Sequence, residues 1–286
     1  MQSASPQNLP PFGRFAPRAI MERILRFTRS APQSWAGKRS ALFMRSWAIY
    51  GLRGAPLDVE VMGARMRLFP YNNVCEKRIL FTPQYFDEEE RQYLQRQITP
   101  EFTFLDIGAN VGGYSLFVGA IAGPRARILA IEPQPAIFER LIFNIQQNPF
   151  ATIKAINCAM ADRDGEITLF VDRQNQCETS MRRVRSDHDS TIINVPGLSL
   201  KSLLAQERIT HIDAIKLDVE GAEDLILENF FKDADPSLWP RILLMENSSQ
   251  GWSIDLHGLI RQMGYTETLR TRSNIAYERQ PANPGI

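Results

Sequence analysis

Three charged side chains alternate in one short segment, IKLDVEG, which contains Lys216, Asp218 and Glu220. Alternate residues of a strand lie on one face of its sheet, so these side chains share a face if the strand stays extended that far. Charged groups on a core strand are unexpected unless they line a cleft. We predict that Asp218 positions an acceptor or takes its proton, with Lys216 modulating it and Glu220 near the next helix. The alternative is an ion pair that only braces that helix.

A second set of candidate residues lies in the glycine-rich segment FLDIGANVGGYSL and in the following AIEP. Asp106 stands two residues before the first glycine of the turn. Glu132 ends the next predicted strand, where its carboxylate can accept both hydroxyls of a ribose. Two classes of ligand, dinucleotides and S-adenosylmethionine, compete for such a turn.

The residues of the turn favour S-adenosylmethionine. A dinucleotide fingerprint would need a glycine at Asn110, and Asp106 would repel its diphosphate. S-adenosylmethionine carries an ammonium and a sulfonium group and no phosphate, so the acid attracts it. The spacing of Glu132 suits either cofactor. A nicotinamide cofactor and a sheet that binds nothing at this edge therefore stay as alternatives.

These residues must be positioned by strands and helices that alternate along the chain. The predicted strands cover residues 103–107, 126–133, 151–159, 161–172, 211–221, 241–247, 265–269 and 274–279. The predicted helices cover residues 112–123, 136–148, 199–207, 222–233 and 253–264. The last helix has Ser253 as its candidate N-cap and Gly264 as its stop. This alternation implies a doubly wound, mostly parallel sheet that binds ligands at the carboxyl ends of its strands.

The first 54 residues differ from the rest in charge. They carry nine basic residues and one acid, Glu22, so they sum to +8 although the whole chain is only +1. Residues 1–17 contain four prolines and are expected to be flexible. Residues 17–30 predict a basic amphipathic helix. This helix either contacts an anionic membrane or an acidic partner, or packs on its own domain with a solvated arginine face.

The charge change divides the chain into a leader, residues 1–54, and one domain, residues 55–286. Two alternating segments, 57–63 and 64–71, predict a hairpin that turns near Gly63. Residues 87–98 predict a helix with acids in its first turn. We therefore expect a hairpin and helix over residues 55–98 and the core of the domain over residues 99–286.

Composition narrows the class of protein. Hydrophobic residues make up 44% and charged residues 23%, as in soluble globular proteins, and the net charge indicates no nucleic-acid partner. The cysteines Cys75, Cys158 and Cys177 have neither paired spacing nor an adjacent histidine, so we expect no disulfide framework and no metal site. We expect a cytoplasmic protein, free in solution or in peripheral contact with the inner membrane face through residues 18–54.

The polar segment 174–191 is predicted to be a loop. Its arginines would suit a phosphate or carboxylate on an acceptor, and the alternative is a solvated surface loop. His188 within it is interpreted as incidental.

Taken in order, the segments resemble the FkbM-type methyltransferases, which are S-adenosylmethionine-dependent enzymes. The matching segments are FLDIGANVGGYSL, AIEPQPAIFERLIFNI, NCAMADRDGEITLF and IDAIKLDVEGAEDLIL, followed by LLMEN and a late GY. The resemblance covers roughly residues 57–279, and KLDVEGAE is its most specific part. The family often has an acid in a T-L-D-D-L-like segment where this chain has SLKSL with Lys201, so no acid-dependent role is expected there.

The resemblance implies a fold and a set of cofactor-binding residues. The fold is the α/β, class I methyltransferase fold, a Rossmann-like, doubly wound, mostly parallel sheet with an antiparallel C-terminal strand and an N-terminal helical and hairpin extension. The cofactor is S-adenosyl-L-methionine. The implied cofactor-binding residues are Asp106, Gly108, Ala109, Asn110 and Gly112 around the methionine part, Glu132 and Pro133 at the ribose, Ala159 and Asp162 at the adenine, and Glu89 at the rim.

The resemblance also implies an activity. Members of the fold that methylate amines often carry an N-P-P-Y-like tetrapeptide where this chain has LDVEG. We therefore expect an O-methyltransferase that acts on a hydroxyl of a sugar, glycoconjugate or related metabolite, with a small molecule or glycan as its acceptor. The alternatives are an NAD(P)-dependent oxidoreductase and a non-catalytic methyltransferase-like module that is targeted by its basic leader.

Overall fold

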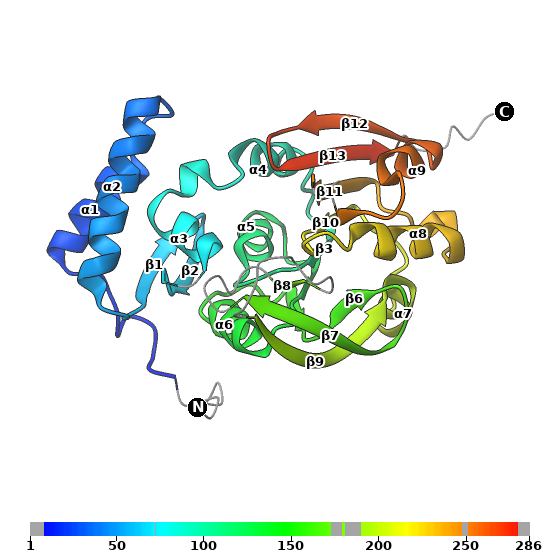
Figure 1. Ribbon diagram of the computed structural model, residues 1–286, viewed down its shortest axis with the longest axis horizontal. Helices are drawn as coiled ribbons and strands as arrows, with labels where there is room; N and C mark the ends of the chain where they lie inside the picture. The colour runs from blue at the N-terminus through cyan, green and yellow to red at the C-terminus, as the bar shows by residue number, and fades with distance from the viewer. Residues whose placement is uncertain (1–8, 72, 173–178, 181–189, 248–250, 280–286) are drawn as a thin grey trace.

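A seven-stranded sheet forms the centre of the computed structural model, which describes residues 9–71, 73–172, 179–180, 190–247 and 251–279. The strand order is β12-β13-β11-β10-β3-β4-β5 (Figure 1). The strands are β3 (Thr103–Ile107), β4 (Arg127–Ile131), β5 (Ile153–Ile156), β10 (Ala214–Leu217), β11 (Ile242–Glu246), β12 (Tyr265–Arg270) and β13 (Asn274–Arg279). The strand β13 runs antiparallel to both of its neighbours, β11 and β12, and all other adjacent pairs are parallel. This topology confirms the predicted doubly wound, Rossmann-like class with an antiparallel C-terminal strand.

Helices cover both faces of this sheet because its strands are apolar on both sides. Alternate residues of β3, Phe104 and Leu105, belong to two different hydrophobic clusters. One face packs against α4 (Glu88–Gln95), α5 (Gly113–Ile121) and α6 (Pro135–Gln146), and the other against α7 (Leu200–Gln206), α8 (Glu223–Asp233) and α9 (Leu256–Gln262). The chain order reverses between β3 and β10, and the carboxyl ends of these strands are where such sheets bind ligands.

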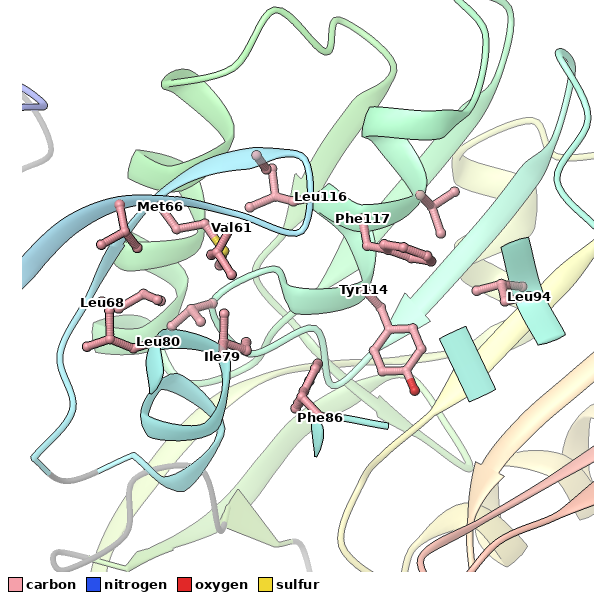
Figure 2. Packing of buried hydrophobic residues seen from close by; sticks show 14 of the residues in the cluster. Val61, Met66, Leu68, Ile79, Leu80, Phe86, Leu94, Tyr114, Leu116 and Phe117 are labelled. Carbon is pink, nitrogen blue, oxygen red and sulfur yellow. The ribbon is translucent and has the colours of Figure 1, made fainter. Parts of the chain in front are cut away.

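The N-terminal part adds a helical pair and a hairpin to this core. Its elements are α1 (Ala19–Arg29), α2 (Trp35–Leu52), β1 (Leu57–Val61), β2 (Ala64–Leu68) and α3 (Val74–Phe81). The hairpin turns at Gly63, as predicted, and its side chains Val61 and Met66 pack with α3 and α5 (Figure 2). The predicted amphipathic helix is α1, and its Ile24 and Leu25 join the same cluster.

The sequence patterns missed two N-terminal helices for physical reasons. The fully buried residues of α2 are the small Gly37, Ala41 and Ala48, and its large aromatic residues are exposed, so the apolar pattern of the helix does not indicate which face packs inward. The helix α3 is only eight residues long. In the described part of the chain, no helix is long and apolar enough to cross a membrane.

The predicted strand over residues 151–159 is divided between two sheets. Its first part is β5, and its end begins β6 (Ala159–Ala161). Between them Asn157 turns its amide to the carbonyls of Glu132 and Pro133, at 2.8 and 3.1 Å. The second sheet has the order β6-β9-β7-β8, with β7 (Gly165–Asp172), β8 (Thr179–Ser180) and the unpredicted β9 (Ser190–Ser199).

Most of the predicted loop over residues 174–191, including His188, lies outside the described residues. The predicted N-cap of the last helix is wrong. The side chain of Asp255, not Ser253, accepts from the backbone of α9, at 2.9 Å from the Gly258 nitrogen, whereas Ser253 donates to Asp224. Gly264 follows the helix with φ of 86°, as expected of a stop.

Residues 10–15 are held against the hairpin, although the prolines predicted flexibility. The buried Arg67 guanidinium donates to both carboxylate oxygens of Asp58, at 2.6 and 2.9 Å, and to the carbonyls of Pro10 and Pro11. The Asp58 carboxylate also accepts from the backbone nitrogens of Gly13 and Phe15. One buried ion pair therefore fastens the segment to the domain.

Replacing Asp58 by alanine should lower the free energy of unfolding by about 3–5 kcal/mol, because it leaves the Arg67 charge buried without its partner. Urea denaturation measures this loss. The double variant Asp58→Ala/Arg67→Met removes both charges and should lose clearly less than the single variant. Equal losses in the two proteins would contradict a structural role for the pair.

Candidate functional site

Two adjoining cavities open at the carboxyl ends of β3, β4 and β10. The first, here the apolar cavity, has about 680 Å³ of open space and is lined by Ile107, Ile131, Met160 and Leu169 together with Glu132. The second, here the acidic cavity, is lined by five carboxylates and two cations: Asp87, Asp106, Asp218, Glu220 and Glu246, with Arg78 and Lys216. Both cavities share Gly108, Asn110, Asp218 and Glu220 among their walls. The two cavities therefore form one continuous site with an apolar part and an acidic part.

The glycine turn between β3 and α5 uses its own backbone donors internally. The nitrogens of Gly108 and Ala109 donate to the Ile131 carbonyl at 3.0 and 2.9 Å, and that of Asn110 donates to Glu132 at 2.9 Å. The next two nitrogens, at residues 111 and 112, donate to the Asn110 side chain and to the Ala109 carbonyl. All five amides of the turn are thus engaged within the protein.

Gly108 is required by a close backbone approach. It has φ of 80°, and a Cβ atom built on it would lie 2.0 Å from the carbonyl oxygen of Asp218. The absence of a side chain lets the tips of β3 and β10 meet, which brings the turn against the residue that we predicted to be catalytic.

Asp106 points into the start of α5. It is 1% exposed, and its Oδ2 accepts from the Ser115 nitrogen at 2.9 Å and from the Ser115 hydroxyl at 2.6 Å. Burial raises the pKa of this carboxyl, while the charge of Lys216 and the bonds from Ser115 oppose the rise. Asp106 lines the acidic cavity, where its charge acts, and it also fixes the first turn of the helix.

Lys216 joins two aspartates on adjacent strands. It lies opposite Asp106 in the register of β3 and β10, and its Nζ donates to Asp218 Oδ2 at 2.7 Å. Burial lowers the pKa of the amine, but the charges of Asp218 and Asp106 outweigh burial, so its pKa lies above its ordinary value. The ammonium also lies 4.9 Å from the centre of the Tyr114 ring. Lys216 therefore stays charged and holds Asp218 in place.

The strand ends at Leu217, so the three alternating charges do not share one strand face. The chain bends at Glu220, whose φ is 54°, and Glu220 still lines both cavities. Glu223, in the first turn of α8, accepts from the nitrogens of Val219 and Gly221, each at 3.3 Å, and from the Trp252 indole at 2.9 Å. The buried Glu223 thus shapes the bend after β10.

Glu132 directly follows β4 and lies in the wall of the apolar cavity. Its two carboxylate oxygens accept from the backbone nitrogens of Asn110 and Gln134, each at 2.9 Å. Burial raises the pKa of Glu132 to about 7, although these two hydrogen bonds favour the ionised form. Each oxygen keeps a lone pair that can accept a ligand hydroxyl.

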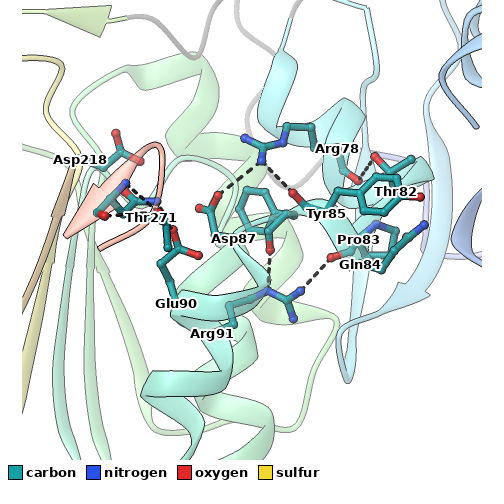
Figure 3. A network of polar contacts seen from close by, with 12 residues as sticks. Arg78, Thr82, Pro83, Gln84, Tyr85, Asp87, Glu90, Arg91, Asp218 and Thr271 are labelled. Carbon is teal, nitrogen blue, oxygen red and sulfur yellow. Dashed lines mark hydrogen bonds and ion pairs between the residues drawn. The ribbon is translucent and has the colours of Figure 1, made fainter. Parts of the chain in front are cut away.

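The segment before α4 closes the acidic cavity. Asp87 has φ of 43° and accepts from the Tyr114 hydroxyl at 3.2 Å, and Arg78 lies 3.5 Å from its carboxylate (Figure 3). Burial raises the pKa of Asp87, with Arg78 and Lys216 opposing. Burial also raises the pKa of Tyr114 well above its ordinary value, so its hydroxyl remains a donor.

The structure brings most of the residues predicted from the sequence to the two cavities. Asp106, Gly108, Ala109, Asn110, Glu132, Pro133, Ala159, Lys216, Asp218 and Glu220 line one or both. Three others lie elsewhere. Gly112 packs against Leu141 behind the wall, Asp162 is exposed beyond β6, and Glu89 is exposed on α4. At the start of α4, two other acids face inward instead of Glu89. Asp87 lines the acidic cavity, and the buried Glu90 accepts hydrogen bonds from Thr271 and Asn274.

Several lining residues carried no recognisable sequence signal. Cys75 and Arg78 come from the short helix α3, and Met160 and Leu169 come from the second sheet. Tyr114 could have been noticed, because a tyrosine in the first turn after a glycine loop places a hydroxyl near the strand tips.

Residues 106–266 match the model of the methyltransferase FkbM domain. Among curated proteins, methyltransferase sdnD of Sordaria araneosa is 27% identical over 163 residues, which cover 47% of this chain and 61% of that protein. Methyltransferase 1 of Beauveria bassiana is 27% identical over 146 residues, which cover 43% of this chain and 57% of the relative. The chain thus spans less than two thirds of either relative.

A solved structure of the human methyltransferase 10 domain containing protein has a TM-score of 0.42 and 14% identity, and the match covers 83% of this chain and 95% of that one.

Replacing Glu132 by glutamine should change how stability depends on pH. The folded chain holds the Glu132 proton more tightly than the unfolded chain, with a pKa near 7 instead of the ordinary 4.5, so its stabilising effect is full below pH 4.5 and is lost as the pH rises through 7. The free energy of unfolding of the wild type, compared with the variant, should fall by about 3 kcal/mol between pH 4.5 and 8. Denaturant titrations across this range measure the difference, and parallel curves would contradict the buried carboxyl.

Proposed function

Because the chain belongs to the FkbM methyltransferase family, we propose that it is an S-adenosylmethionine-dependent O-methyltransferase. One observation supports S-adenosylmethionine over a dinucleotide: all five backbone amides of the glycine turn, residues 108–112, already donate hydrogen bonds within the protein. A dinucleotide needs such amides for its diphosphate. Among the described residues, no lysine or arginine lines the apolar cavity, whereas Glu132, Asp218 and Glu220 do. This charge disfavours a diphosphate and suits a cation.

The two cavities fit the two halves of S-adenosylmethionine. Met160 and Leu169 provide apolar walls for a flat base, and Glu132 has lone pairs free to accept ribose hydroxyls. The acidic cavity, with five carboxylates and two cations, suits an ammonium and a sulfonium group. When bound, the cofactor supplies a methyl group that a nucleophile can displace from sulfur.

Asp218 is the candidate base for an acceptor hydroxyl. Lys216 holds its Oδ2, while Oδ1 accepts no hydrogen bond from the described part of the chain. The side chain is 36% exposed and lines both cavities, so Oδ1 can accept a hydroxyl and take its proton as the oxygen becomes the nucleophile. Lys216 cannot act as this base, because its pKa is raised and it keeps its proton.

The acidic cavity suits an acceptor with several hydroxyl groups. Carboxylates accept hydroxyl protons, and Ser273 and Asn274 add groups that both donate and accept. The segment LDVEG after β10 stands where amine-methylating enzymes often carry N-P-P-Y. These features support a sugar, glycoconjugate or related metabolite as the acceptor.

Calorimetry with S-adenosylhomocysteine and with NAD tests the choice of cofactor. The chain should bind S-adenosylhomocysteine and show no measurable heat with NAD, because the amides of residues 108–112 are engaged and carboxylates line the cavity. Binding of NAD without S-adenosylhomocysteine would favour the nicotinamide oxidoreductase instead.

Replacing Asp218 by asparagine should lower the rate of methyl transfer by about 10²–10⁴-fold while the affinity for S-adenosylhomocysteine is retained, because the amide keeps the shape and cannot take a proton. A screen of sugar acceptors with methyl-labelled cofactor supplies the assay. Asp162→Asn, at an exposed acid outside both cavities, is the matched control and should stay active. If the Asp218→Asn enzyme is as fast as the control, Asp218 is not the base. If the wild-type chain binds the cofactor but methylates none of the acceptors, the result favours the non-catalytic module.

A further inference from the structure

The helix α2 leaves most of its large apolar side chains exposed, while Met44, Ile49 and Leu52 pack against the core and are partly buried. Its buried positions are Gly37, Ala41 and Ala48, whereas its exposed apolar residues are Trp35, Leu42, Phe43, Trp47 and Tyr50. Trp35, Phe43 and Tyr50 are 77%, 72% and 88% exposed. The five side chains fall within a sector of about 140° at 3.6 residues per turn, so they form one face, here the aromatic face.

An ordinary surface helix turns its largest apolar residues to the core, whereas the two tryptophans, the phenylalanine and the tyrosine of α2 are exposed. A Cβ atom on Gly37 would lie 2.4 Å from the Pro32 carbonyl oxygen, so the inner face of the helix leaves no room for a larger residue there. The helix therefore packs inward through its small residues and the partly buried Met44, Ile49 and Leu52, and no other described element covers the aromatic face. An exposed apolar patch of this kind is typical of a docking surface.

Exposed basic residues lie on α2 and on the neighbouring helix α1. Lys38 and Arg39 on α2 and Arg23 and Arg26 on α1 are exposed, and the Arg39 guanidinium lies 5.6 Å from the Trp35 ring. Glu22 is the one acid among residues 1–54. The two helices stand together at the end of the molecule opposite α9 (Figure 1). Tryptophan and tyrosine side chains near lysine and arginine are typical of protein surfaces that bind at the interface between lipid headgroups and acyl chains.

We propose that the aromatic face of α2 docks on the surface of a bilayer that contains anionic lipids. The positive charge of residues 1–54 favours a bilayer over a second copy of the chain as the partner of this face. A second copy would bring two leaders of +8 together, which like-charge repulsion disfavours. An anionic bilayer neutralises the same charge and takes up the aromatic side chains. The sequence predicted a membrane contact through residues 18–54, with α1 as its amphipathic helix. Because α1 buries Ile24 and Leu25 on its own domain and exposes only Ile20 and Phe27, we assign the main contact to the larger aromatic face of α2.

Sedimentation of the full chain with vesicles tests the proposal. The wild type should partition at least about tenfold more strongly onto vesicles of phosphatidylcholine and phosphatidylserine, 7:3, than onto phosphatidylcholine alone, and should lose this preference in high salt. Phe43→Ser/Trp47→Ser should lower the partition coefficient on the anionic vesicles at least about tenfold. Ile192→Ser removes a side chain of β9 that is 63% exposed, and as the matched control it should bind like the wild type.

A second double variant distinguishes a loss of membrane binding from misfolding. Lys38→Gln/Arg39→Gln keeps the aromatic face and should lose much of the preference for anionic vesicles, while circular dichroism melting of both double variants should match the wild type. Failure of the wild type to bind anionic vesicles would overturn the proposal. A wild-type dimer in analytical ultracentrifugation that Phe43→Ser/Trp47→Ser converts to a monomer would also overturn it and would assign the face to a second copy.

Discussion

A buried lysine between two aspartates holds the candidate site together. Lys216 lies opposite Asp106 across β10 and β3, and it donates to Asp218 just beyond the end of its own strand. A lysine in the core of a sheet would be costly without such partners, so the three groups must stay together. Asp106 binds Ser115 at the start of α5, and the cation therefore ties two strand tips, a helix and the exposed carboxylate of Asp218 into one unit.

The glycine turn follows from the same constraint. Because Gly108 meets the Asp218 carbonyl, β3 and β10 can approach closely enough for the charged triad to form. The turn then folds onto Ile131 and Glu132 of the neighbouring strand and uses its amides there. These contacts engage the amides of residues 108–112, and carboxylates dominate the walls of the site. The proposed preference for a cationic cofactor rests on these engaged amides and on the carboxylates.

Much of the core could be predicted because parallel strands read as short apolar runs between helical patterns. Asp106, Glu132, Lys216 and Asp218 stood out for a related reason, since charge at the end of an apolar strand is unusual. The rest depends on packing that spacing does not encode. The fully buried residues of α2 are small, while its aromatic residues are exposed. The start of α4 is such that Asp87 faces the cavity while Glu89 faces solvent. The predicted third strand breaks at Asn157, which brings Met160 to the apolar cavity and leaves Asp162 outside.

The account holds that one continuous site binds an adenosine in the apolar cavity and presents its sulfur to Asp218 in the acidic cavity. A crystal structure of the chain with S-adenosylhomocysteine measures this most directly. The account predicts the ribose hydroxyls on the Glu132 carboxylate, the base between Met160 and Leu169, and the sulfur on the side of Asp218. A ligand bound away from Glu132, or one whose sulfur faces away from Asp218, would contradict it.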